Sequence, residues 1–574
     1  PHRMYSTIGR LADGATLDGA RREIDGVARR IARDYPESNQ GWGVSLVRAE
    51  DQLLGDTSRV VWILFGAVSL VLLMGCANVS NLLLIRSGER SGQAAVRAAF
   101  GASPRDLVRQ LLAEGVVIGV LGGAAGIFVA FVAVGGLRRV LPAGFPRVDE
   151  IELDPVVLVF SVAVGLLAGL ISSLPPALQS MRPDLVRTLV DAGRGASLGK
   201  RWKNVSSALI SAEVALALVL MLGAALLLQT YSRLASVDPG YRTDSVVAVA
   251  VELSPARYGT MAEQRTFFTD LMTRVRQLPG VEAVGAVSYL PMSPIGLEFD
   301  IPFTVEGLDA SSPSQRPTAE YRGVFPGYFD AMDIEIVAGR ALNDLDGTDG
   351  HGVALVNQTV VQRYFSERDP VGQTIEMPML GQVEVVGVVE DIRHDGIGVE
   401  ANPELFVPFV QLPMASMHIV AHTPGNADVV AGLIRSAVLA IDPQQTISKV
   451  NLLSDLVSDS IAPPRFNMIL VLGLACCAVL LALVGVHGVV SYAVSNRAYE
   501  IAIRMALGLN SWSAVWLALA QAGKVIVGGV VAGLALASAM VPALGALLYE
   551  VEPFDLPTFL GATMGLTLVA LVSA

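Results

Sequence analysis

Seven long apolar runs dominate this sequence, and they limit it to folds in which much of the chain crosses a membrane. A helix needs roughly 20 apolar residues to cross a bilayer. The runs cover residues 60–85, 111–134, 156–176, 206–229, 466–494, 521–548 and 555–574. Two of them, "GVLGGAAG" in the second and "GGVVAGLALAS" in the sixth, are rich in small residues. Small residues favour close helix packing, although a general glycine and alanine bias of the genome would give the same pattern.

The composition agrees with a multi-span membrane protein that carries a soluble part. The chain is 52% hydrophobic and only 16% charged, a balance that does not suit one large soluble domain. Its net charge of -12 argues against a nucleic-acid partner, which would need a basic face. The three cysteines, Cys76, Cys476 and Cys477, all lie in apolar runs, so no disulfide framework is predicted. The polar start at Pro1 and the apolar end lead us to expect a piece of a longer polypeptide, missing material at both ends.

The distribution of basic residues predicts an orientation in the membrane. Lysine and arginine gather in the connections 86–110 and 177–205, and counting spans puts both on one side together with 495–520. The positive-inside rule makes that side cytoplasmic. The large polar region 230–465 and the opening segment fall on the opposite side. The connection 135–155 is discordant, but its four acidic residues offset its three arginines.

Region 230–465 has the mixed pattern of a soluble α+β domain. Strand-like runs lie at 245–253, 281–290, 351–357 and 383–392, and helix-like runs lie at 262–278, 357–365 and 428–441. Clusters of proline, glycine and aspartate such as "NDLDGTDGHG" mark the turns between them.

The order of elements before the spans repeats, which indicates an internal duplication. A predicted helix at 17–35 and a strand at 43–50 precede the first span. The same order, a helix at 427–441 and a strand at 446–451, precedes the fifth. Copy one is then the end of a soluble domain plus three spans, and copy two is a leading span, a complete soluble domain and three spans.

A short charged helix is predicted between two spans in each copy. In copy two the residues that form its faces at helical spacing are Arg497, Glu500, Ile501, Arg504, Met505 and Gly508. In copy one the corresponding segment contains Arg90, Gln93, Arg97 and Gly101. A glutamate four residues before an arginine stabilises an exposed helix by about 0.3–0.5 kcal/mol.

Each charged helix is expected to end at its glycine and to be followed at once by a new helix. Glycine reaches the left-handed conformation of a helix C-cap without strain. In "SPRD", Ser103 is the predicted N-cap, Pro104 the first helical residue and Asp106 the residue that closes the capping box. Asn510 is predicted to cap the equivalent helix of copy two.

Two functions fit such helices. An amphipathic helix can lie in the membrane interface, where its basic residues meet anionic lipid headgroups. Alternatively, the two helices form a docking surface for a cytoplasmic protein. The duplication favours docking, because a dimeric partner needs a two-fold arrangement of contacts.

At these residues the chain resembles a known family. "YEIAIRMALG" and the small-residue-rich span after it look like the FtsX-like permease domain of MacB-type ABC transporters. The soluble part is similar to the MacB-like periplasmic core domain through "IVAGRALNDLDG", "VALVNQTVVQRYFSERDPVGQTI" and "VEVVGVVEDIRHDG". The duplicated layout resembles the acidobacterial duplicated orphan permeases. The resemblance covers essentially the whole chain, and the periplasmic motifs are its more specific part.

The resemblance implies a multi-pass α-helical protein of the bacterial inner membrane with an α+β periplasmic core domain. The implied domains are a C-terminal remnant of a first periplasmic core domain (1–59), a first FtsX-like permease domain of three spans (60–205), a leading span (206–229), a second periplasmic core domain (230–465) and a second FtsX-like permease domain whose last span is truncated (466–574).

The resemblance also implies a mechanism, mechanotransmission. A separate cytoplasmic ABC ATPase subunit pulls on coupling helices, here about 88–101 and 495–508, and the spans relay the motion to the periplasm. The implied partners are that ATPase, membrane lipid, a periplasmic protein and an unknown substrate. Copy one departs from the pattern, because Gln93 stands where copy two has Glu500. Equal binding of the ATPase by the two halves is therefore in doubt.

ATP hydrolysis by this chain is not expected. A P-loop needs G-x-x-x-x-G-K-[ST], and the nearest approach is "GRGASLGKR". There Arg194 replaces the first glycine and Arg201 replaces the hydroxyl that would bind magnesium. The segment is more simply a basic tether beside a span.

No catalytic residue, cofactor or metal site is predicted. His418 and His422 share a strand face, but no third ligand is close in sequence. "EDIRHDG" reads as a polar turn rather than as an acid–base site. Polar residues inside spans are functional candidates by default, and here they are Asn78, Asn81, Glu213, Gln229 and His487. None is assigned a transport role from the sequence.

Three functions remain to be weighed. The first is a non-catalytic permease subunit coupled to an ATPase. The second is a membrane-anchored scaffold or sensor that binds an extracytoplasmic partner without an ATPase. The third is a membrane enzyme with its site in 230–465. The paired charged helices favour the first function, and the absence of a nucleophile–base or metal-ligand pattern disfavours the third.

Overall fold

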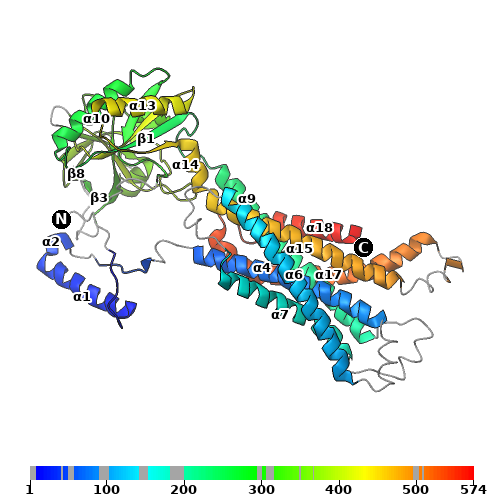
Figure 1. Cartoon of the computed structure of the whole chain (residues 1–574). Coiled ribbons are helices and arrows are strands. Elements are labelled where there is room, and N and C mark those ends of the chain that lie inside the picture. Colours follow the sequence, from blue (N-terminus) through cyan, green and yellow to red (C-terminus); the bar gives the residue numbers. More distant parts are fainter. Residues whose placement is uncertain are drawn as a thin grey trace. The chain divides into compact units, whose positions relative to one another are not determined.

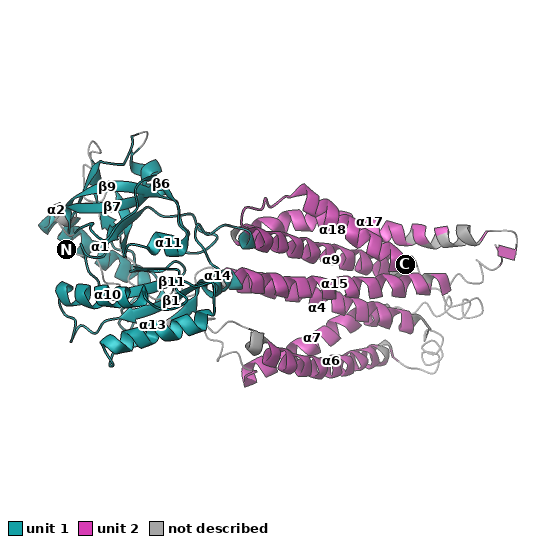
Figure 2. Cartoon of the chain, turned by 90° about the horizontal axis from the view of Figure 1, so that it is seen from above, with its two compact units in different colours: residues 1–55, 234–462 teal, residues 56–233, 463–574 magenta. Residues whose placement is uncertain are grey.

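The chain divides into two compact units, residues 1–55 with 234–462 and residues 56–233 with 463–574 (Figure 1, Figure 2). A computed structural model describes residues 8–39, 43–49, 57–89, 103–140, 153–180, 200–293, 300–305, 316–347, 351–365, 368–495, 503, 505–506 and 510–573.

In its described residues the second unit contains seven helices long and apolar enough to cross a membrane, which confirms the predicted number of spans. They are α4 (Thr57–Glu89), α6 (Pro104–Val140), α7 (Pro155–Ser180), α9 (Lys200–Ala235), α15 (Ala462–Ser495), α17 (Ser511–Leu544) and α18 (Leu556–Ser573). Helix is the form expected in lipid, because it satisfies every backbone polar group within one segment. The sixth predicted run extends too far, since α17 ends at Leu544 and a 3-10 turn, Gly545–Leu547, follows it.

Glycines bring the backbones of α6 and α7 into direct contact, as the small-residue pattern predicts. A methyl group added to Gly165 would lie 3.1 Å from the carbonyl oxygen of Gly119 and 3.2 Å from Cα of Gly123. The backbones of α17, the sixth span, and α9 also approach closely, because a methyl group on Gly533 would lie 2.9 Å from Cα of Ala215. Without side chains at these points, the helices pack closely through van der Waals contact.

The first unit is built on a mixed sheet, to which the described residues contribute twelve strands. Along the sheet the order is β12 (Ile447–Leu452), β1 (Val246–Glu252), β11 (Ser416–His422), β2 (Ala283–Val287), β5 (Thr318–Val324), β10 (Glu404–Pro408), β7 (Gly352–Asn357), β9 (Gly381–Val389), β8 (Thr374–Met377) and β4 (Thr304–Val305). Beside this path, β3 (Asp300–Pro302) pairs with β5 and β6 (Ile336–Gly339) pairs with β9.

The sheet has two halves that join at a single residue pair. Among the described residues, β2 and β5 are in register only at Val287 and Val324. The backbone N–H of Phe325 donates to the carbonyl oxygen of Ala286 at 2.8 Å, and that of Ser288 donates to Gly323 at 2.8 Å. These two halves are the lobes of the sheet, and one hydrophobic core runs across the join between them.

Helices cover both faces of the first half of the sheet, which explains its continuous apolar strands. Along β1, Val247 and Val249 pack in the core formed with α10 (Met261–Val275) and α13 (Ala427–Ile441). The alternate residues Val246 and Ala248 pack in the other core, with α11 (Tyr328–Met332) and α14 (Leu453–Ser460). Figure 1 shows α10 and α13 beside β1.

The predicted strands and helices of region 230–465 are confirmed, with one change of form. The run 357–365 makes only a short helix, α12 (Gln358–Val360), which widens into a π turn at Val361–Phe365. Asn357 is the N-cap of this helix, and its side chain accepts a hydrogen bond from the N–H of Val360 at 3.1 Å.

The opening segment follows the prediction only in part. The predicted helix is present as α1 (Leu17–Asp34), followed by the short α2 (Pro36–Asn39). The strand predicted at 43–50 is wrong, because residues 43–48 are not in a strand and Val44 and Val47 are about half exposed. A strand needs a hydrogen-bonded neighbour, and the described residues provide none here. Among the described residues, this segment is held by the hydrogen bond from Arg21 Nε to the carbonyl oxygen of Leu46, at 3.1 Å.

Candidate functional site

Most of the residues predicted to couple this chain to an ATPase lie outside the part of the chain that the structure describes. These are Arg90, Gln93, Arg97, Gly101, Arg497, Glu500, Ile501, Arg504 and Gly508. Met505 is described: it is helical, and its side chain is 45% exposed.

The helix that follows the first coupling segment begins as predicted. The backbone N–H and the hydroxyl of Ser103 donate to Asp106 Oδ2 at 3.1 and 2.8 Å. The bond from the Ser103 hydroxyl holds the pKa of Asp106 below its ordinary value. In copy two the prediction holds in part: Asn510 is the N-cap residue of α17, with extended backbone, but its side chain makes no capping bond. The position that matches Asp106 is Ser513, so there is no carboxylate to accept the bond from the N-cap N–H in a capping box.

Polar side chains inside the membrane unit join helices that are far apart in sequence. Asn78 on α4 donates from Nδ2 to the carbonyl oxygen of Leu481 on α15, at 2.9 Å. Ser206 on α9 donates to Asn81 Oδ1 at 2.5 Å. These bonds tie the first predicted copy to the second. Ser206 is the member that the sequence analysis missed, although it lies seven residues before Glu213 and so on the same side of the helix.

The remaining polar residues of the spans also have defined positions. The hydroxyl of Thr558 at the start of α18 lies 3.3 Å from Gln229 Oε1 on α9. The Nδ1 atom of His487 lies 3.1 Å from the carbonyl oxygen of Ser573. Glu213 is buried in α9, with 1% of its surface exposed.

A buried cluster of charged side chains lies next to the join between the two lobes of the sheet. Arg322 on β5 is fully buried and forms ion pairs with Glu320 on its own strand and with Glu404 on β10, the latter at 3.1 Å. The ring of Tyr289 stacks on its guanidinium, with Cζ 4.9 Å from the ring centroid. Burial of charge is costly unless it is paired and hydrogen-bonded, so this cluster depends on all its members.

His394 completes the cluster from the segment that the sequence predicts to be a polar turn. The segment lies outside any helix or strand, with a bend at residue 395, but its histidine is buried and Nδ1 lies 2.7 Å from Glu404 Oε1. Burial lowers the pKa of His394, against the opposing effect of the Glu404 carboxylate. The sequence carried no sign of this contact, because the partners lie on strands joined only in three dimensions.

His418 is a second buried histidine in the same domain. It lies on β11 opposite Ala250 of β1 and is 1% exposed. Burial lowers its pKa to about 4. His422, on the same strand face, is instead 3.5 Å from Glu282. In the described part of the chain no three histidine, cysteine or acidic residues are grouped to hold a metal ion.

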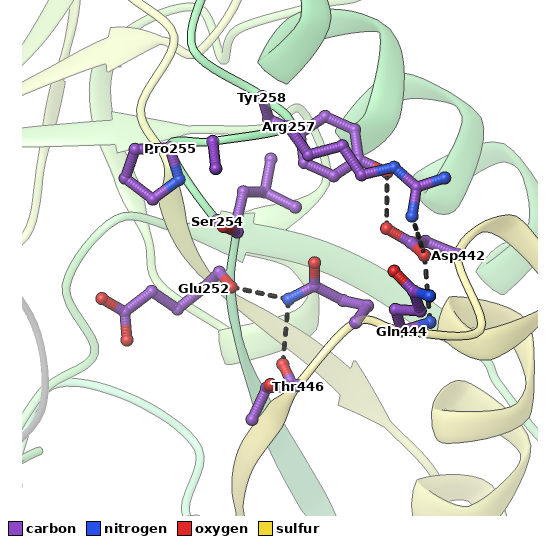
Figure 3. A pocket seen from close by; sticks show the side chains of 11 residues that line it. Glu252, Ser254, Pro255, Arg257, Tyr258, Asp442, Gln444 and Thr446 are labelled. Carbon is purple, nitrogen blue, oxygen red and sulfur yellow. Dashed lines mark hydrogen bonds and ion pairs between the residues drawn. The ribbon is translucent and has the colours of Figure 1, made fainter.

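A polar pocket of about 550 Å³ lies where the turn after β1 meets the turn before β12. Figure 3 shows Arg257 and Tyr258 reaching toward Asp442, at distances of 2.6 and 3.0 Å. The N–H of Gln444 also donates to Asp442, and this bond is the largest effect that lowers the pKa of the carboxyl. The Asp442 carboxylate is therefore satisfied by Arg257, Tyr258 and the backbone of Gln444.

The family models match the two kinds of unit that the fold contains. The MacB-like periplasmic core domain matches residues 207–449, and the FtsX-like permease C-terminal model matches residues 65–185 and 472–574. The chain belongs to the MacB-like ABC transporter permeases. This MacB-like permease is a multi-pass protein of the inner membrane, and its α+β domain is periplasmic.

The curated relatives of the MacB-like permease match it over only part of their own length. One is a pyoverdine export ATP-binding/permease protein PvdT of Pseudomonas fluorescens, 30% identical over 189 residues, which cover 31% of this chain and 26% of the relative. Another is a macrolide export ATP-binding/permease protein MacB of Hyphomonas neptunium, 36% identical over 135 residues, which cover 23% of this chain and 20% of the relative. The chain thus matches about a quarter of their length.

One solved structure is similar to part of the MacB-like permease. It is the periplasmic region of MacB from Actinobacillus actinomycetemcomitans, at 14% identity and a TM-score of 0.28, over 39% of this chain and 94% of that one. The family assignment rests on the two family models and not on this similarity.

Proposed function

We propose that this MacB-like permease couples ATP hydrolysis by a separate cytoplasmic ATPase subunit to work on a substrate or partner in the periplasm, by mechanotransmission. The observation that carries the proposal is that the FtsX-like permease model matches two stretches, 65–185 and 472–574. Each stretch includes one of the two charged connections, 86–110 and 495–520, between consecutive spans. These connections are the proposed coupling helices.

The two permease stretches form a pair within one chain in this proposal. We infer a duplication with domain limits at 59, 205, 229 and 465, in which the unit at 60–205 and the unit at 466–574 are equivalent. The bonds Asn78–Leu481 and Ser206–Asn81 support the pairing, because each joins a span of the first copy to one of the second. A paired set of coupling helices suits a dimeric ATPase.

The connectivity of the periplasmic domain supports transmission of a pull. Helix α9 leads through residues 236–245 into β1, and β12 leads through α14 into α15. The strands β1 and β12 are antiparallel neighbours, with Val249 opposite Val450. A displacement between α9 and α15 would therefore act on two adjacent strands of one sheet, and the pocket at Asp442 lies at their connecting turns.

The substrate is left open in this proposal. Export is the activity in the names of the relatives, one for pyoverdine and one for macrolides. The polar periplasmic surface and the FtsX-like bundle suit export, lipoprotein release or activation of a wall hydrolase equally. The scaffold or sensor remains the alternative, and it requires no ATPase.

Purification of the full chain from native membranes, with identification of the proteins bound to it, tests the proposal. We expect a cytoplasmic protein with a P-loop ATPase domain to be bound, and its ATPase activity to change when the permease is present. A preparation that contains periplasmic proteins but no ATPase would support the scaffold and overturn the coupling role.

A further inference from the structure

One acidic side chain lies inside the helix bundle and is not used by the proposed coupling function. Glu213 is nine residues after Asn204, where the span in α9 begins, so it lies about 14 Å along the helix at 1.5 Å per residue. The candidate span runs from Asn204 to Ala235 over 32 residues, so Glu213 lies inside it, in the third nearest its N-terminal end. The side chain is 1% exposed, and among the described residues neither carboxyl oxygen has a hydrogen-bond partner.

The carboxyl group faces an acceptor oxygen of another helix. A methyl group added to Gly485 on α15 would overlap Glu213 Oε2 and would lie 2.8 Å from Asn78 Oδ1 on α4. Both oxygens therefore point at the same place on α15. The orientation of the Asn78 amide is fixed, because its Nδ2 donates to the carbonyl oxygen of Leu481 at 2.9 Å. Its other end, Oδ1, is thus the atom turned toward the carboxyl.

Two acceptor oxygens in a buried site repel each other unless a proton or a cation lies between them. A divalent cation would need six or more oxygen ligands. Here Gly485 has no side chain, and Glu213 and Asn78 supply the oxygens. A single proton on the carboxyl satisfies both requirements, since it removes the charge and provides a donor.

Charged groups on the neighbouring helices point elsewhere. The thiol of Cys76 on α4 lies 3.7 Å from the carbonyl oxygen of Ala168 on α7. His487 on α15 contacts the carbonyl oxygen of Ser573, and Lys524 on α17 is exposed. The other charged residues of these helices and of α9 lie near helix ends and are Arg59, Arg86, Glu89, Lys200, Arg201, Lys203, Arg233 and Arg465. No ion pair with Glu213 is formed by the described residues.

We propose that Glu213 is a proton-binding site at the meeting point of α4, α9 and α15, and that its protonated carboxyl faces Asn78 as donor. The proton comes from water and returns to water, and no other bond changes. The hydrogen-bonded pair Ser206–Asn81 lies between this site and the basic end of α9, and gives the proton a polar route from that end. Loss of the proton places an unpaired charge between three packed helices. Protonation therefore favours the packed arrangement, which goes beyond the proposed coupling to an ATPase.

Infrared spectroscopy of the purified full chain in lipid vesicles tests the site. At neutral pH we expect a protonated-carboxyl C=O band that is absent from Glu213→Gln, a variant that keeps the shape of the side chain. The exposed Glu263 provides the control, because hydrogen bonds from Thr260 lower the pKa of its carboxyl. The variant Glu263→Gln should keep the band. A wild-type spectrum without that band, or loss of carboxylate bands instead in Glu213→Gln, would overturn the proposal.

Variants of the neighbouring residues keep the test informative if Glu213→Gln does not fold. Asn78→Ala removes the acceptor, so the band should remain and move to the higher frequency of a free carboxyl. Gly485→Ala should also move the band, because its methyl group displaces the carboxyl. Gly488→Ala on the same helix meets no atom within 4 Å and should leave the band in place. A band that is unchanged in both Asn78→Ala and Gly485→Ala would contradict the site.

Discussion

The side-chain amide of Asn78 donates a hydrogen bond to the carbonyl oxygen of Leu481 across 2.9 Å, and so joins two spans that lie 403 positions apart in the chain. One span belongs to the first FtsX-like stretch and the other to the second. Hydrogen bonds between membrane helices contribute about 0.6 kcal/mol on average and up to about 1.7.

Replacing Asn78 by alanine should therefore lower the stability of the bundle by about 1 kcal/mol. The measurement is thermal unfolding of the purified chain in detergent. Ser69→Ala is a matched control on the same helix, because among the described residues the Ser69 hydroxyl bonds within its own helix, to the carbonyl oxygen of Phe65 at 2.8 Å. Equal shifts for the two variants would show that the contact between helices contributes nothing.

The glycine contact between α6 and α7 should not tolerate a side chain. A methyl group on Gly119 would lie 3.3 Å from Cα of Gly169 and would overlap the carbonyl oxygen of Gly165. Gly119→Val should destabilise the protein by about 1–3 kcal/mol, as overpacking does elsewhere. Gly126→Val, on the same helix with no atom within 4 Å, should cost much less. Melting temperatures of both variants, compared with wild type, decide whether the close approach stabilises the pair.

The buried charge cluster should be far more sensitive than a surface ion pair. Arg322→Leu leaves Glu320 and Glu404 buried without their cation and should cost about 3–5 kcal/mol. The exposed pair of Arg276 with Asp344, at 3.4 Å, is the comparison, and Arg276→Leu should cost less than about 1 kcal/mol. Limited proteolysis and thermal unfolding measure the loss. A similar loss in the two variants would mean that the cluster does not hold the lobes together.

His418 should make the stability of the protein fall as the pH falls. In the folded domain its pKa is about 4, whereas an unfolded chain takes up the proton near pH 6.5. Between these values the unfolded state binds a proton that the folded state does not, so stability is lost on acidification, by about 3 kcal/mol from pH 7 to pH 4.

In the variant His418→Leu, the loss of stability on acidification that is caused by His418 should be absent. A loss of this size corresponds to a fall of roughly 6–12 °C in melting temperature for a domain of this length. Melting temperatures of wild type and variant between pH 4 and pH 7 give the difference. If the melting temperatures of the two proteins fall in parallel with pH, His418 does not contribute to the pH dependence of stability.

The sequence sufficed for the elements whose period and length are unambiguous. The seven spans, α10, α13 and β1 follow directly from long apolar runs or regular alternation. The helix start at Ser103 also follows, because its cap depends on residues three positions apart. The strand predicted at 43–50 failed for the opposite reason, since a strand exists only with a neighbour to pair with.

Contacts between distant parts of the chain could not be predicted from the sequence. Arg322, Glu404 and His394 each look like ordinary polar residues of a soluble domain until the pairing of β5 with β10 brings them together. The sequence did single out Asn78 and Glu213 as polar residues in apolar spans. It gave no sign that both face Gly485, because that depends on how three helices pack.

Arg504→Glu in native membranes tests whether the charged helix of copy two binds a cytoplasmic ATPase. We expect the variant to insert normally and to lose the ATPase on purification, while Arg97→Glu loses less of it, because copy one has Gln93 in place of an acid. Arg435→Glu, at an exposed position on α13, is the control and should keep the ATPase. If the ATPase co-purifies with Arg504→Glu at the wild-type yield, the charged helix of copy two does not bind it.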